Sequence, residues 1–245
     1  MVERILTKKG QAILKWYLRE ESKEYSMGQK VNPKGFRLGQ FYNWSSRWFA
    51  SGGKYRDLVL IDANLRKALM EKLKPAGIAQ VEIERLINKI EITVHVSRPG
   101  IVIGRGGSGL EELKKFIGGI LGVKAGEKNI LKLELKVEPI KEPNLNAYLV
   151  AVNIADQLAK RIPHKRVIRQ AVQRVMAAGA QGARVILSGR IAGAEIARHE
   201  KYQQGRMPLT TMRERIDFVA FPALTKSGYI GVKVWICEPS SKSQI

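Results

Sequence analysis

Apolar residues alternate with polar ones, or recur at helical spacing, in two successive parts of the chain. In the first part, alternation predicts three strands, which we place at residues 80–86, 90–96 and 131–137. Helical spacing predicts a helix from Asp62, as its N-cap, to about Leu73, and another that begins near Ser108. A short helix at residues 100–103 and a glycine-rich turn precede the second of these helices. The predicted order is therefore helix, strand, strand, short helix, loop, helix, strand.

The second part begins after a short polar segment that contains prolines, at residues 139–144. Helical spacing predicts a helix at residues 145–160 and another from Pro163 to about Ala178. Four strands follow, at residues 184–190, 197–203, 213–220 and 229–237. Because helices come first and strands after them, we expect an α+β domain with two helices on a four-stranded sheet.

These patterns divide the chain into two domains with flanking segments. The segments are an N-terminal extension at 1–26, an arm at 27–61, a first domain at 62–138, a linker at 139–144, a second domain at 145–238 and a tail at 239–245. Residues 1–26 carry apolar residues at helical spacing among charged ones, which fits either an extension helix or a start codon assigned upstream of the real one.

Aromatic and basic residues are interleaved in the predicted arm. Such a segment can wrap onto RNA, and its candidate contacts are Lys30, Lys34 and Arg37. The alternative is that Trp44, Trp48 and their aromatic neighbours cover an adjacent core. The sequence leaves both interpretations open.

The charge of the chain is strongly one-sided. The 245 residues contain 43 Lys and Arg against 22 Asp and Glu, a formal net charge of +21. Between Gln157 and Ala194 the chain has basic residues and no acidic one. A polyanion is the expected partner, and nucleic acid is the first candidate.

The predicted helix after Pro163 concentrates this charge on one side. Lys165, Arg166 and Arg169 fall within a sector of about 100°, opposite a flank of apolar residues. With Arg161 they are the candidate RNA or mRNA contacts of the second domain; the alternative is an ordinary solvated helix face. Further possible RNA contacts are Arg190, Arg198, Arg206 and Arg213.

The glycine-rich turn has four interpretations. Gly104, Gly106 and Gly109 match the dinucleotide-binding pattern G-x-G-x-x-G, but the preceding strand does not run directly into the turn. A P-loop would need a Lys followed by Ser or Thr after the glycines, which is missing. The sequence Gly104-Arg105-Gly106-Gly107 between two helices is typical of the KH loop, which clamps a nucleic-acid backbone. A plain turn remains the fourth possibility.

Several separate segments resemble the bacterial form of the third small-subunit ribosomal protein family. They lie in the family's order from Met27 to about Ile236, and they are Met27–Gly39, Trp44–Ala50, the glycine loop, Gly189–Arg198, Gly205–Leu209 and Gly231–Ile236.

This resemblance implies a type II KH domain followed by an α+β domain. It implies a cytoplasmic, ribosome-bound protein that contacts small-subunit rRNA, neighbouring proteins of the subunit head, and mRNA at its entry channel. The family's mRNA-handling cations match Lys165, Arg166 and Arg169. Any opening of structured mRNA would be passive, since motifs for nucleotide hydrolysis are missing.

Other classes of function find little support in the residues. Cys237 is the single cysteine, which rules out an internal disulfide and a Cys-based zinc site. His95, His164 and His199 lack metal-ligand spacing, and no nucleophile and base can be paired, so we expect no metal, no cofactor, no small-molecule substrate and no enzyme activity. No apolar run approaches the roughly 18 residues of a membrane span. Two other functions stay open: a free KH-type RNA-binding factor in transcription or RNA decay, and a nucleotide-dependent oxidoreductase.

Overall fold

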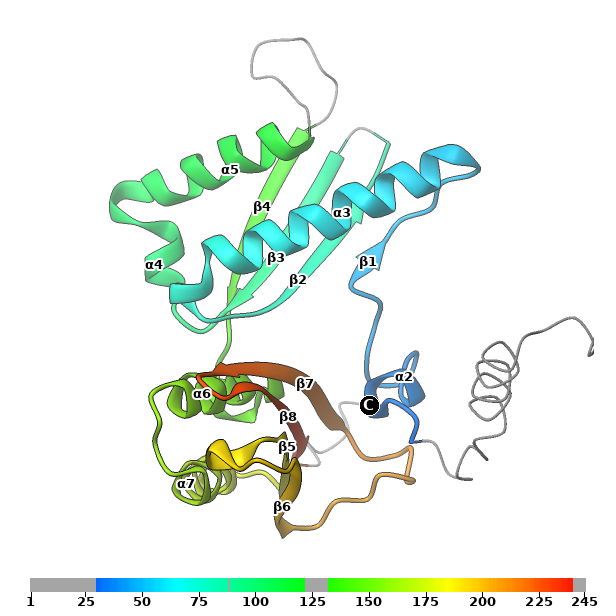
Figure 1. Ribbon diagram of the computed structural model, residues 1–245. Helices are drawn as coiled ribbons and strands as arrows, with labels where there is room; N and C mark the ends of the chain where they lie inside the picture. Colours follow the sequence, from blue (N-terminus) through cyan, green and yellow to red (C-terminus); the bar gives the residue numbers. More distant parts are fainter. Residues whose placement is uncertain (1–29, 88, 122–131, 240–245) are drawn as a thin grey trace, which may run out of the picture. The chain divides into compact units, whose positions relative to one another are not determined.

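The computed structural model describes residues 30–87, 89–121 and 132–239, and Figure 1 shows their helices and strands. The predicted N-terminal extension and all but the first residue of the predicted tail lie outside these residues.

The first domain is a sheet with helices on one face. Its strands are β1 (Ser46–Arg47), β2 (Ile78–Arg85), β3 (Lys89–Val96) and β4 (Lys132–Pro139), in the spatial order β1-β2-β3-β4. Strands β2 and β3 are antiparallel, whereas β1 is parallel to β2 and β4 is parallel to β3. The three predicted strands are therefore confirmed with small shifts at their ends, and the two-residue β1 joins from the arm.

Two long helices cover this sheet (Figure 1). Helix α3 (Gly53–Lys72) and helix α5 (Ser108–Leu121) place Leu65, Leu69, Leu113 and Ile117 in the core, against the alternating apolar residues of β2 and β3. The short helix α4 (Pro99–Ile103) contributes Val102. Alternation along the strands leaves the opposite face of the sheet polar.

The predicted start of the first helix is wrong. Helix α3 begins at Gly53, and Asp62 lies buried inside it. The Asp62 carboxylate accepts hydrogen bonds from Arg85 on β2 and, at 2.8 Å, from the indole of Trp48. An acidic residue that serves a tertiary ion pair thus resembles an N-cap in the sequence, and the segment predicted as an arm ends in helix.

The second domain also packs its helices on one face of a sheet. Helices α6 (Ala147–Ala159) and α7 (His164–Ala177) cover strands β5 (Gly182–Gly189), β6 (Arg198–Gly205), β7 (Ile216–Thr225) and β8 (Gly228–Cys237). The strand order is β6-β5-β8-β7, and all neighbours are antiparallel. The predicted α+β architecture of both domains is confirmed. The segment predicted as a linker contains the end of β4 and a short 3-10 turn, Pro143–Leu145.

The opposite face of the second sheet has its own small core. Ile216, Trp235 and Cys237 are buried there, and Met207 and Leu209 from the β6–β7 connection pack against them. The connection is held by Arg37, which follows the short helix α2 (Pro33–Phe36) and has no exposed surface. Its guanidinium donates to five backbone carbonyls, those of Pro33, Pro208, Leu209, Thr211 and Glu214.

Candidate nucleic-acid interface

The glycine loop of the first domain lies between two helices. Helix α4 ends at Ile103, residues Arg105–Gly107 form a 3-10 turn, and α5 starts at Ser108. Gly104 and Gly106 have φ of 69° and 62°, a left-handed conformation that glycine adopts without strain. The dinucleotide-binding interpretation is wrong because a helix, and not a strand, leads into the turn.

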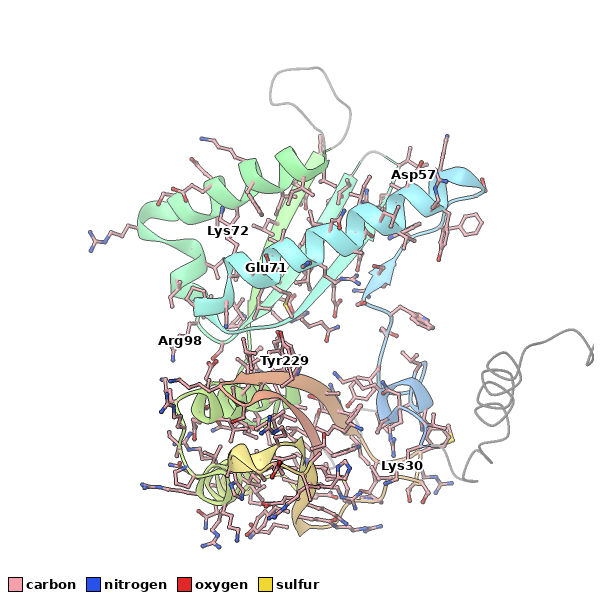
Figure 2. All side chains as sticks on the ribbon, in the orientation of Figure 1. Lys30, Asp57, Glu71, Lys72, Arg98 and Tyr229 are labelled. Atoms are coloured by element: carbon pink, nitrogen blue, oxygen red, sulfur yellow. The ribbon has the colours of Figure 1, made fainter. Side chains whose placement is uncertain are left out.

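Side chains around this loop leave its backbone open. Arg105 is exposed, and the hydroxyl of Ser108 donates to the Arg105 carbonyl at 3.1 Å, which fixes the loop against the first turn of α5. A Cβ at Gly106 would meet no atom within 4 Å, so space for a ligand exists at this position. Arg98, labelled in Figure 2, is exposed just before α4, and sequence patterns did not single it out.

Helix α7 separates its core residues from its cations. Val167, Ile168, Val172 and Val175 are buried in the second domain. Lys165, Arg166 and Arg169, which we call the α7 basic face, are exposed. Among the residues that the structure describes, none of these three forms a salt bridge. His164, the first residue of the helix, does pair with Glu200, at 3.0 Å between Nε2 and Oε2.

The start of α7 also lacks acidic residues. Its first turn contains none, and its N-cap, Pro163, supplies no side-chain hydrogen bond. Cations in the first turn oppose the helix dipole at a cost of about 0.3–1 kcal/mol each. The helix therefore carries Lys165 and Arg166 where they do not stabilise the fold.

On the outer face of the first domain's sheet, two lysines are paired with carboxylates, in contrast to the cations of α7. Lys136 and Lys89 both bind the carboxylate of Glu91, and these hydrogen bonds hold the pKa of Glu91 below its ordinary value. Lys89 also binds Glu134 at 2.7 Å, and the pKa values of Lys89 and Lys136 are raised in return. Lys89 and Lys136 are thus neutralised within the domain, whereas no carboxylate among the described residues pairs with the α7 basic face.

The other predicted RNA contacts fall into three groups. Lys30, Arg161, Arg190, Arg198 and Arg213 are exposed. Lys34 and Arg206 pair with Asp217 and Glu214, at 2.6 and 3.2 Å. The prediction for Arg37 is wrong, because its guanidinium is fully buried and its donors are bound to carbonyl oxygens. A positive charge in an arm looks the same in sequence whether it faces RNA or clamps a loop.

The aromatic residues of the arm divide between the two interpretations. Trp48 is half-buried, donates its indole N–H to Asp62 and lies 5.4 Å from the ring of Tyr55. Trp44 and Phe49 are 69% and 93% exposed.

Within the described residues, no three His, Cys, Asp or Glu gather as a metal site, and no helix has the length and hydrophobicity needed to cross a membrane.

A glycine loop between two helices, on a sheet with mixed parallel and antiparallel pairs, is the arrangement of KH-domain proteins, and the chain belongs to this class. The family model for the KH domain matches residues 64–145, and the model for the C-terminal domain of ribosomal protein S3 matches residues 154–236.

Full-length relatives extend this match. Small ribosomal subunit protein uS3 of Hydrogenovibrio crunogenus is 48% identical over 219 residues, which cover 89% of this chain and 92% of the relative. The protein of the same name from Carboxydothermus hydrogenoformans is 46% identical, over 86% of this chain and 91% of its own length. That from Lactobacillus acidophilus is 46% identical, over 86% and 90%. The chain belongs to the uS3 family of small ribosomal subunit proteins.

Proposed function

We propose that this protein is a structural, non-enzymatic component of the small ribosomal subunit that binds rRNA through its KH domain and holds mRNA on the α7 basic face. Membership in the uS3 family supports the ribosomal role. The observation that carries the mRNA part is the set of three exposed cations on α7, which form no salt bridge with any residue that the structure describes.

The KH loop suits rRNA because of its open backbone. Glycines with positive φ let a phosphate approach the main chain, and the N-terminus of α5 follows directly after the turn that begins with Arg105. A KH loop of this kind clamps about four nucleotides. This grip positions the protein and carries little sequence information.

The α7 basic face suits a mobile strand better than a permanent contact. Long, unpaired cations exchange phosphates readily and recognise charge, not sequence. Holding a strand that has just separated shifts the equilibrium of an RNA duplex toward the open form without consuming a nucleotide. We propose small-subunit rRNA and neighbouring proteins of the subunit head as the further partners.

Replacing the three side chains of the α7 basic face tests the proposal. Lys165, Arg166 and Arg169 changed together to Ala should leave the unfolding curve nearly unchanged, since all three side chains are exposed. Affinity for single-stranded RNA should fall, and the slope of log K against log salt should flatten by roughly 0.7 for each lost phosphate contact.

A matched control removes the same charge elsewhere. Arg56, Lys89 and Lys136 are already paired with carboxylates, so their joint replacement by Ala should leave the salt slope as in the original chain. If both triple variants changed the slope equally, net charge and not the α7 face would bind RNA.

Assembled subunits test the mRNA role. Subunits that contain the α7 variant should sediment normally but translate through a stable hairpin more slowly, with unchanged speed on an unstructured message. A protein that sediments apart from small subunits at moderate salt would instead be a free RNA-binding factor.

A further inference from the structure

Three turns of the second domain, distant in sequence, enclose a cavity of about 280 Å³. They are the α6–α7 turn with Arg161 to His164, the turn after β5 with Arg190 to Gly193, and the β7–β8 turn with Thr225 to Ser227. We call it the turn cavity. It is separate from the α7 basic face, although His164 in its wall directly precedes that face.

The cavity combines an apolar floor with a cationic rim. Leu158 and Ile230 are buried beneath it, and Ile162 packs on the same core. Arg161, Arg190 and Lys226 are exposed around it. Across the described ranges none of these three forms a salt bridge; Arg190 donates from Nε to the Ala194 carbonyl at 3.0 Å.

Backbone strain is concentrated at the same place. In the described part of the chain, the two non-glycine residues with positive φ are Arg161 at 60° and Ala192 at 55°, and both line the turn cavity. Such a conformation costs of order 1–3 kcal/mol for a residue with a side chain, and strained residues cluster at binding sites. At Arg161, a position suited to glycine keeps a cationic side chain.

We propose that the turn cavity takes one unstacked nucleotide of single-stranded RNA, with its base on the apolar floor and its phosphates at Arg161, Arg190 and Lys226. Small-molecule pockets begin at about 300 Å³, so this volume suits one nucleotide and not a longer segment. Unstacked bases with exposed apolar faces are what proteins recognise in single-stranded RNA.

RNA is favoured over a free nucleotide because the cavity opens beside α7. His164 lines the cavity and is also the first residue of α7. An RNA strand that is bound by the α7 basic face and continues past His164 therefore places its next nucleotide at the cavity. The inference therefore rests on the proposed RNA binding by the second domain, and it adds a base-dependent contact to a charge-dependent one.

Filling the cavity without changing its charge separates the two contacts. Ser227→Phe adds bulk to the wall, whereas Leu224→Phe adds the same side chain to an exposed position of β7 that does not line the cavity. We measure binding of a fluorescent single-stranded RNA by anisotropy, across salt concentrations, after confirming each fold by circular dichroism.

Ser227→Phe should weaken binding roughly five- to tenfold, the scale of one lost base contact, with an unchanged salt slope. It should have no effect on binding of an abasic RNA of the same length. Equal affinity of the Ser227→Phe and Leu224→Phe variants for the normal RNA would overturn the inference. Failure of the proposed function gives a different result, because the triple variant of the α7 basic face would then bind RNA with an unchanged salt slope.

Two further experiments test the cavity without relying on the Ser227→Phe variant alone: photocrosslinking of RNA and binding of a free nucleotide. RNA with a single 4-thiouridine, photocrosslinked to the unsubstituted full chain, should attach to peptides that contain Ile162, Pro163 or Ile230; attachment confined to other peptides would contradict the inference even if Ser227→Phe failed to fold. AMP alone should not saturate the protein below about 1 mM. Saturation at lower concentration, lost in Ser227→Phe, would assign the cavity to a free nucleotide and overturn its assignment to RNA.

Discussion

Replacing Arg37 by Leu tests whether a buried cation holds the second domain together. The substitution keeps much of the aliphatic bulk and removes the donors to five carbonyl oxygens. Four of those carbonyls belong to residues 208–214, the connection that packs Met207 and Leu209 over Trp235 and Cys237. The connection should therefore detach from the sheet.

The magnitude follows from the two shortest bonds. The guanidinium reaches the carbonyls of Glu214 and Thr211 at 2.7 Å, and hydrogen bonds to charged groups contribute about 1.5–3 kcal/mol each. We count these two fully and assume that water replaces the longer three, which gives a loss of about 3–6 kcal/mol. That is a large part of the roughly 5–15 kcal/mol that stabilises a domain.

Urea unfolding measures the loss, and iodoacetamide labelling of Cys237 locates it. Because Cys237 lies beneath the connection, its alkylation in the folded protein should accelerate in Arg37→Leu. Arg37→Lys should be intermediate, since an ammonium keeps the charge but lacks the planar fork. Arg56→Leu, at an exposed pair, should stay within about 0.5 kcal/mol of the unsubstituted chain. If Arg37→Leu matched Arg56→Leu in both assays, the clamp would not stabilise the domain.

Three further predictions concern the loop, the thiol and the strained turn. Gly106→Asp should weaken RNA binding more than Gly106→Ala in a filter-binding assay, because both strain a φ of 62° but only Asp adds negative charge; equal losses would leave backbone strain as the sole cause. Burial and a hydrogen bond to Glu214 raise the pKa of the Cys237 thiol from 9.0 to about 12. The neutral thiol therefore contributes fully to the free energy of unfolding below about pH 9, and this contribution is lost as the pH rises toward 12. Cys237→Ala should flatten the fall of the melting temperature across that range, and an unchanged fall would contradict it. Arg161→Gly should melt at the same or a higher temperature, because glycine relieves the positive φ, and yet bind RNA less tightly; a lower melting temperature would show that the side chain supports the fold.

Sequence patterns located the elements well where each carries a continuous apolar face. Strands β2 and β3 alternate buried and partly exposed residues, and α7 buries one side, so period alone identified them. The start of α3 was missed because its first turns have no strong apolar stripe and Asp62 resembles a cap. The short strand β1 was missed because two residues have no detectable period.

Local spacing and residue type were enough to predict the fold class, the glycine loop between two helices and the cationic side of α7, and the resemblance of several segments indicated the family. Which cations remain free to bind RNA depends instead on tertiary contacts. These contacts bury Arg37 and pair Lys34 and Lys89, whereas Lys165 and Arg166 form no salt bridge within the described ranges. They also bring Arg161, Arg190 and Lys226 around one cavity. The free energy of a charge depends on the water and carboxylates within a few ångströms, and those neighbours come from distant parts of the chain.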